Sequence, residues 1–373
     1  MWRKGIAIQI VISVVVAAAA ALLPTSPALA GGRGEPIMGD VNGDGNEDLI
    51  YLGIIQPDSC SVIVRHGRPT GGYQLPTAYV YMKPGGTGTG IACPDLGVAV
   101  DLTNDNIDEL VIGWFAGTPA SVDYNLLVLD PTFAPLFALP DALFQPSYLG
   151  LADFDGDGRQ DVYSTTDQGE GFETHLNLAD DGTLTNGPVR FCAGPITYEL
   201  QDFNNNGAMD VLISYLLSCD DQTNGVVVVL DDGSVAQLQR DELEVDCWTS
   251  EIVFANADTI PDVRTTSEVT GQVDILIGRG DGTFVRAPTA VADSVTLSGA
   301  APTIINVLAN DFATSSATVE IVEGPRYGTA VVLGDGRVHF TPAPGNRATD
   351  RFVYRLSDNG RRSNTSVHVR YSD

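Results

Sequence analysis

The sequence has little positive charge. It contains 20 Lys and Arg residues against 48 Asp and Glu, which gives a formal net charge of −28 at pH 7. The imbalance lies in residues 31–288, with 10 basic and 40 acidic residues, whereas residues 289–373 have eight of each. Because an acidic surface repels the phosphates of DNA and RNA, we expect no nucleic-acid partner.

The sequence also lacks the usual catalytic motifs. Its four histidines are scattered, and none has metal-ligand spacing to another; they are His66, His175, His339 and His368. It has neither a Gly-x-Ser-x-Gly nucleophile turn nor a Walker phosphate loop. Because its many Asp residues would hide a glycosidase pair, a polysaccharide hydrolase or lyase stays an alternative. We favour a protein that is not an enzyme.

Only one apolar run approaches the length that spans a membrane. Arg3 and Lys4 precede the run from Ile6 to Leu23, and Ala28-Leu29-Ala30 has the form of a cleavage site. We therefore expect residues 1–30 to be a signal peptide and the mature protein to be secreted, or attached to the cell surface, without a membrane span. An uncleaved anchor is the alternative, because about 20 apolar residues cross a bilayer.

The sequence contains only five cysteines, which is an odd number. The five residues are Cys60, Cys93, Cys192, Cys219 and Cys247. Export permits disulfides, and an odd count leaves at least one thiol unpaired. We expect the sequence neighbours to pair, Cys60 with Cys93 and Cys192 with Cys219. A bridge between Cys219 and Cys247 is the alternative.

An acidic nine-residue pattern recurs five times. The copies span residues 40–48, 101–109, 153–161, 202–210 and 254–262. Side chains with oxygen occupy positions 1, 3, 5 and 9 in most copies, and Gly or Asn often stands between them. A loop of this spacing can enclose a hard cation such as Ca²⁺, which binds six to eight oxygens. We expect calcium to be the bound ion.

The loops differ from EF-hands. An EF-hand needs a bidentate Glu at position 12 and flanking helices. Position 12 of the five copies is Tyr51, Ile112, Ser164, Ile213 and Thr265. Short β-rich runs follow each loop, such as Leu49–Leu52 and Val211–Ser214, and Asp-Gly pairs mark later turns. A period near 50 residues with about four strands is typical of a propeller blade.

These motifs resemble the FG-GAP/VCBS repeat of integrin α-subunits and many secreted bacterial proteins. The resemblance lies in the loops, the strands after them and the run Leu276–Phe284, and it covers about residues 34–288. It implies a β-propeller over residues 31–288, for which we expect five blades. Because the integrin-type ring has seven, further degenerate blades or an incomplete ring closed by a partner are alternatives.

The resemblance also implies a ligand set. In that family the side chains at positions 1, 3, 5 and 9 and the carbonyl at position 7 bind calcium. The corresponding residues of the first four loops are Asp40, Asn42, Asp44, Asn46, Asp48; Asp101, Thr103, Asp105, Ile107, Glu109; Asp153, Asp155, Asp157, Arg159, Asp161; and Asp202, Asn204, Asn206, Ala208, Asp210. The carboxylate count predicts that affinity falls in the order third, first, second, fourth loop. Phe254 replaces the first carboxylate of the fifth copy, which we expect to bind no metal.

Residues 289–373 differ in character. They have no cysteine and contain seven short β-rich runs, which predict an Ig-like β-sandwich. The runs Val307–Asp311, Val338–Pro342 and Asp350–Asp358 resemble the cadherin-like or bacterial Ig-like domains of surface proteins. The whole chain is therefore expected to be all-β, with a propeller followed by a sandwich.

The combination favours a secreted calcium-binding protein that mediates adhesion or binds a ligand at a propeller face. The expected ligand is an extracellular protein or glycan. A passive structural module of the cell wall is a further alternative. Arg279-Gly280-Asp281 spells an integrin-recognition tripeptide, but it falls in a repeat turn and we interpret it as coincidence.

Overall fold

The computed structural model describes residues 35–56, 59–82, 93–114, 126–139, 146–166, 171–194, 196–241, 245–345 and 349–372. The predicted signal peptide lies outside these residues. Regular structure in the described chain consists of 27 β-strands, so the all-β prediction is confirmed there. No helix among the described residues is long and apolar enough to cross a membrane.

Five four-stranded antiparallel sheets come first, each made from strands that are consecutive in the sequence. The first sheet contains β1 (Ile37–Gly39), β2 (Asp48–Gln56), β3 (Ser59–Arg65) and β4 (Thr77–Met82). The second contains β5 (Leu96–Val100), β6 (Glu109–Gly113), β7 (Leu126–Leu129) and β8 (Pro135–Leu139). The third contains β9 (Tyr148–Ala152), β10 (Asp161–Thr166), β11 (Gly171–Leu176) and β12 (Thr185–Phe191). The fourth contains β13 (Ile196–Gln201), β14 (Asp210–Tyr215), β15 (Asn224–Val229) and β16 (Val235–Asp241), and the fifth contains β17 (Trp248–Val253), β18 (Asp262–Ser267), β19 (Val273–Gly278) and β20 (Phe284–Arg286).

Each acidic nonapeptide connects the first two strands of its sheet. Position 1 directly follows the first strand and position 9 begins the second strand in all five sheets. In the first four loops, positions 4 and 6 have positive φ, as at Asn104 (56°) and Gly158 (86°). Gly and Asn adopt this left-handed conformation most readily, which explains their recurrence at both positions.

Apolar side chains fill the spaces between successive sheets. Val62 and Ile112 lie between the first and second sheets, and Val128 and Val162 lie between the second and third. The interfaces that follow contain aromatic and aliphatic residues such as Phe172, Val211, Leu212 and Val263. Because β6 and β14 are buried on both faces, their central residues Leu110–Ile112 and Val211–Ile213 are apolar without alternation.

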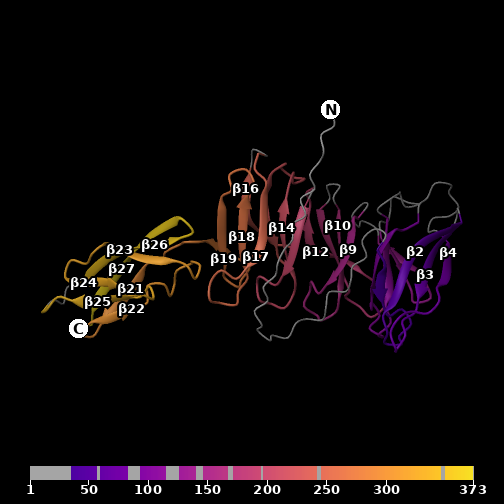
Figure 1. Cartoon of the computed structure of the whole chain (residues 1–373), viewed down its shortest axis with the longest axis horizontal. Helices are drawn as coiled ribbons and strands as arrows, with labels where there is room; N and C mark the ends of the chain where they lie inside the picture. The colour runs from indigo at the N-terminus through magenta and orange to yellow at the C-terminus, as the bar shows by residue number, and fades with distance from the viewer. Residues whose placement is uncertain are drawn as a thin grey trace.

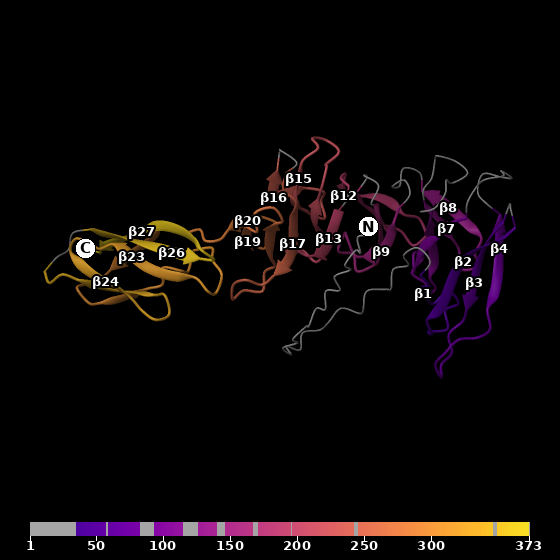
Figure 2. The same ribbon diagram turned by 45° about the horizontal axis from the view of Figure 1, so that its top comes forward.

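The five sheets stand in an open row. Figures 1 and 2 show the first sheet at one end and the fifth at the other, with the C-terminal strands beyond the fifth. A closed five-bladed ring would bring the first and fifth sheets together. The prediction of five repeats therefore agrees with the structure, but ring closure is not seen in the part of the chain that the structure describes.

Two disulfides tie neighbouring sheets together. Cys60 of β3 bridges to Cys93, which precedes β5, and Cys192 after β12 bridges to Cys219 in the turn between β14 and β15. Cys247 is the free cysteine. Both favoured pairings are confirmed, and the alternative bridge between Cys219 and Cys247 is not formed.

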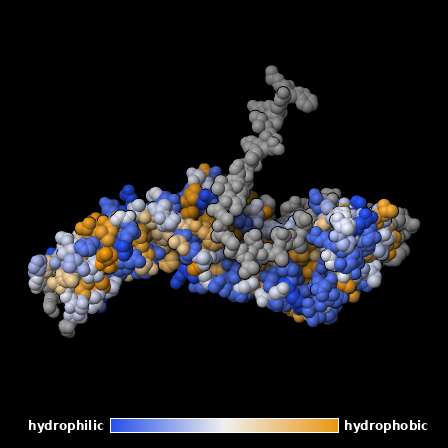
Figure 3. Space-filling model, turned by 60° about the horizontal axis from the view of Figure 1, so that its bottom comes forward, coloured by the Kyte–Doolittle hydropathy of each residue, from blue (hydrophilic) through white to orange (hydrophobic). Residues whose placement is uncertain are grey.

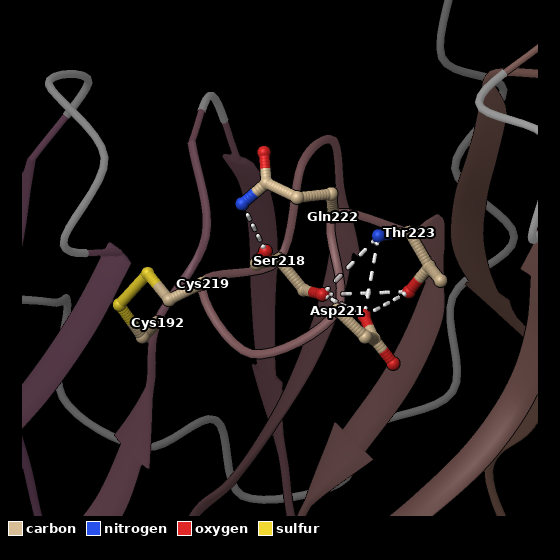
Figure 4. Close-up of a disulfide and its surroundings, with 6 residues drawn as sticks. All are labelled: Cys192, Ser218, Cys219, Asp221, Gln222 and Thr223. Carbon is tan, nitrogen blue, oxygen red and sulfur yellow. Dashed lines mark hydrogen bonds between the residues drawn. A yellow bond between two sulfur atoms is a disulfide. The ribbon is translucent and has the colours of Figure 1, made fainter.

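The turn beside the second bridge is held by Asp221 (Figure 4). Its carboxylate accepts hydrogen bonds from the Ser218 hydroxyl and, at 2.7 Å, from Thr223 Oγ1. These hydrogen bonds lower the pKa of Asp221 to about 2. The turn that carries Cys219 is thus held by side-chain hydrogen bonds as well as by the disulfide to Cys192.

The C-terminal strands form a two-sheet sandwich, as predicted. One sheet has the order β21-β27-β26-β23 and the other β22-β25-β24. The strands are β21 (Asp293–Leu297), β22 (Thr303–Ile305), β23 (Thr318–Glu323), β24 (Gly328–Val332), β25 (Val338–Pro342), β26 (Asp350–Asp358) and β27 (Arg361–Tyr371). Its core surrounds the fully buried rings of Phe340, Phe352 and Tyr354.

Candidate metal centre

The carboxylate at position 1 of the first four acidic loops holds the loop backbone. In the third loop, Asp153 Oδ1 accepts the Gly156 amide at 2.7 Å and Oδ2 accepts the Gly158 amide at 2.9 Å. Asp40 and Asp202 bind the amides at the same positions of the first and fourth loops. This capping draws the backbone around the carboxylate and fixes the shape of the loop.

The carboxylates at position 9 are buried. The side chains involved are at most 1% exposed and are those of Asp48, Glu109, Asp161, Asp210 and Asp262. Asp161 accepts the amides of Phe154 and Asn177, each at 2.7 Å. Asp210 accepts two amides in the same way, each at 2.8 Å. Position 9 therefore joins the loop to the following hairpin as well as offering oxygen to an ion.

The third loop gathers three carboxylates. Asp153, Asp155 and Asp161 each place one ligand oxygen within 4.8 Å of the others, and this is the one such group of His, Cys, Asp or Glu among the described residues. Burial raises the pKa of Asp161 to about 7 and also raises the pKa of Asp155. This all-oxygen set, which places the buried carboxylate of Asp161 beside two more accessible ones, fits a hard divalent cation, whose charge would offset the cost of ionising Asp161.

The first loop contains a histidine that sequence spacing did not reveal. His66, which follows β3, places Nδ1 2.9 Å from Asp48 Oδ2 and 2.7 Å from Asn42 Nδ2. The amide nitrogen of Asn42 also approaches Asp48 Oδ2, at 3.2 Å. Asp44 Oδ1 meanwhile accepts the Asn46 amide at 2.9 Å. Two predicted ligands of this loop, Asn42 and Asp48, thus contact each other and the imidazole of His66, which lies 18 residues after Asp48 in the sequence.

The second and fourth loops have the same backbone geometry as the third loop but fewer carboxylates at positions 1, 3, 5 and 9. In the second, Asp101 caps the amides of Asp105 and Asn106, and Thr103 Oγ1 donates to Glu109 Oε1 at 3.3 Å. Burial raises the pKa of Glu109. The amide of Ile107 donates to Asp105 Oδ1 at 2.9 Å.

In the fourth loop, Asn204 Nδ2 donates to Asp231 Oδ1 at 2.7 Å, outside the loop. Asn206 Oδ1 accepts the Ala208 amide at 2.9 Å. The structure therefore places each predicted residue in its loop, while three carboxylates converge in the third.

The fifth loop departs from the others. Phe254 stands at position 1 and is 60% exposed, so it supplies no oxygen to cap the loop. Ala257 and Thr259, at positions 4 and 6, lack the positive φ of the first four loops. Asp262 still joins its loop to β19, because it accepts the amides of Ala255 and Gly278. Position 9 thus keeps its hydrogen bonds where the carboxylate of position 1 is missing, and Asn256 and Asp258 still accept loop amides at positions 3 and 5.

Two features of the loops were not predicted from the sequence. Position 2 is apolar in the first four loops and points into the core, at Val41, Leu102, Phe154 and Phe203. Successive loops also touch, because Asp108 donates its amide to the Asp40 carbonyl and accepts the Asp40 amide, at 2.9 and 2.7 Å. Met209 likewise donates its amide to the Asp153 carbonyl at 2.8 Å. The alternation of polar and apolar positions could have revealed the first feature; the second depends on how the sheets pack.

Arg159 neutralises part of the third loop. Its guanidinium contacts Asp157 Oδ2 at 3.1 Å, Asp180 Oδ1 at 2.6 Å and the Asn177 carbonyl at 2.6 Å. This positive charge beside the carboxylates opposes a cation. We expect Arg159→Gln to raise calcium affinity on the order of three- to tenfold and to lower metal-free stability by roughly 0.2–1 kcal/mol.

Calorimetric titration and thermal melting check the Arg159→Gln prediction. Arg264→Gln is the matched control, because Arg264 pairs with Glu251 on the fifth sheet and both side chains are well exposed. Equal calcium affinity in the wild type and the Arg159→Gln variant would contradict a neutralising role.

The surface around the loops is polar. Figure 3 shows a mostly hydrophilic face over the N-terminal sheets and more hydrophobic colour over the C-terminal sandwich. The exposed aliphatic residues of the sandwich include Val291, Ile304 and Val331. The hydrophilic face thus covers the part of the chain, residues 31–288, that contains the excess of acidic residues.

Comparisons with known proteins identify the C-terminal region. Residues 286–370 match the bacterial Ig domain family, so this part of the chain is a bacterial Ig domain. No curated protein matches the sequence significantly. Among solved structures, the biofilm matrix protein Bap1 of V. cholerae aligns with 90% of this chain at 14% identity and a TM-score of 0.36. The aligned region spans 66% of the Bap1 chain.

Proposed function

We propose that this is an extracellular calcium-binding repeat protein whose FG-GAP/VCBS-type sheets display a surface for adhesion or ligand binding. The observation that carries the proposal is the third loop, where Asp153, Asp155 and Asp161 converge. Calcium would supply charge neutralisation there, and the loop residues would hold it between the first two strands of the sheet. The two disulfides support an oxidising, extracellular location.

The ligand is expected to be a protein or glycan of the cell surface or matrix. A glycan array probed with the full chain, with and without chelator, tests this part of the proposal. Saturable binding that weakens in chelator is the expected result. Turnover of a glycan would indicate the enzyme alternative, and the absence of any saturable ligand would favour a passive structural module.

Calcium dependence can be measured by melting at several pH values. In the metal-free protein, the pKa of Asp161 lies near 7, above its ordinary value of 3.8. Its native state therefore binds the proton more tightly than the unfolded state, so its contribution to stability is present at about pH 4 and is lost as the pH rises to about 7.

Calcium should reverse this trend, because it binds the ionised carboxylates. At a free concentration 100 times the Kd, calcium should stabilise the native state by about 2.7 kcal/mol. We expect a higher melting temperature in calcium than in chelator at pH 7.5, and a smaller difference at pH 5. Identical melting curves in calcium and chelator at pH 7.5 would contradict a calcium site.

A further inference from the structure

The outward face of the fifth sheet is partly covered by the bacterial Ig domain. Residues on β19 alternate between the two faces of the sheet. Leu276 packs toward the fourth sheet, whereas Ile275 and Ile277 pack on the opposite side with Ala255 and Phe312. Phe312 belongs to the segment between β22 and β23 of the sandwich, so an apolar cluster joins the two units.

Backbone hydrogen bonds reinforce this contact. The Ser315 amide donates to the Ala255 carbonyl at 2.9 Å, from the sandwich to the fifth acidic loop. Thr289, in the connecting segment, exchanges hydrogen bonds with Phe312 at 2.8 and 3.0 Å. Arg279 lies over the Phe312 ring, 5.7 Å from its centre. The Arg279 side chain of the Arg-Gly-Asp tripeptide is thus part of this junction, which supports interpreting the tripeptide as coincidental.

A buried carboxylate lies at the centre of a second contact. Asp274 of β19 is 1% exposed and pairs with Arg286 Nη1 of β20 at 3.0 Å. Gln239 of the fourth sheet donates to Asp274 Oδ2, also at 3.0 Å. The guanidinium of Arg361, at the start of β27 in the sandwich, pairs with Oδ1. One carboxylate therefore connects the fourth sheet, the fifth sheet and the hairpin between β26 and β27.

We propose that the bacterial Ig domain is the C-terminal cap of the sheet row, docked on the fifth sheet through Phe312 and the Arg361–Asp274 pair. Stacked repeats expose an apolar face at each end, and a terminal unit must cover it. The cap occupies the side of the fifth sheet on which the first sheet would have to pack in a ring. The docked sandwich therefore keeps the row open, and this role is independent of calcium and of any ligand.

Arg361→Ala and Phe312→Ala in the full chain test the docking. In Arg361→Ala, the Asp274 carboxylate still forms its ion pair with Arg286, so no unpaired charge is left in the fifth sheet. Hydrogen exchange at the Ser315 amide, which donates to the Ala255 carbonyl across the junction, should accelerate on the order of tenfold in both variants, because exchange reports the population of the opened junction. The angular spread between the units should also widen in small-angle scattering.

Arg362→Ala is the matched control. Arg362 neighbours Arg361 on the same hairpin and is exposed, so its loss should leave both measurements at the wild-type values. Circular dichroism checks that each variant remains folded. If Arg361→Ala and Phe312→Ala match the control in exchange of the Ser315 amide and in scattering, the sandwich is not docked and the proposal is overturned. Compact, ring-like scattering from the wild type would overturn it as well.

Discussion

Asp161→Ala should destabilise the metal-free protein by about 2–4 kcal/mol, because two buried amides lose a charged acceptor. These amides belong to Phe154 and Asn177, one in the acidic loop and one after β11. At a free calcium concentration 100 times the Kd, the difference in unfolding free energy between wild type and variant should grow by about 2.7 kcal/mol, since the variant also loses a carboxylate of the cluster. Urea unfolding of both proteins, in calcium and in chelator, measures the two contributions separately.

Asp155→Asn separates folding from metal binding. Asp155 is exposed, and its Oδ1 accepts the Asp157 amide at 3.1 Å, a hydrogen bond that an Asn carbonyl can keep. This variant should match the wild type in chelator and lose much of the stabilisation by calcium. If Asp161→Ala is as stable as the wild type in chelator, position 9 does not hold the loop and the hairpin together.

Removing the bridge between the first two sheets is expected to cost about 3–4 kcal/mol. The Cys60→Ala/Cys93→Ala double variant opens a loop whose ends are 33 residues apart, and chain entropy predicts a loss of this size. Both residues also lie in the apolar cluster between these sheets, so a small packing loss adds to it. Denaturant unfolding without reductant should show a lower midpoint.

Cys247→Ala is the control for the disulfide variant, because Cys247 is the free cysteine. It should leave the midpoint unchanged. Adding reductant should destabilise the wild type and have a smaller effect on the double variant, which retains the bridge between Cys192 and Cys219. A double variant with wild-type stability would show that the bridge between Cys60 and Cys93 contributes nothing.

Much of the fold could be predicted because local signals agree. The strands after the acidic loops contain β-branched and aliphatic residues, as in Val211–Ser214 and Val263–Thr266, and both runs lie within observed strands. The first strand of each sheet was harder to recognise. Strand β13, for example, alternates only between half-buried and exposed positions, which weakens its apolar pattern.

The functional groups of the candidate site were predictable only in part. The sequence marks oxygen ligands by their spacing, because a single loop must bring them together. It cannot mark His66, which reaches Asp48 from the end of β3, or Asp108, which pairs with the preceding loop. These contacts join residues 18 and 68 positions apart, and they depend on strand pairing and sheet packing.

The sequence by itself determined the five strand-flanked acidic loops and the Ig-like sandwich, and it favoured the cysteine pairs without excluding a bridge between Cys219 and Cys247. Each follows from local chemistry: left-handed Gly and Asn positions, oxygen spacing, β-rich runs and short separations. Only the tertiary structure decided that the five sheets form an open row and that three carboxylates converge in the third loop. Those outcomes depend on which faces meet, as where Phe312 and Arg361 cover the fifth sheet, and surface complementarity between distant segments leaves no periodic pattern in the chain.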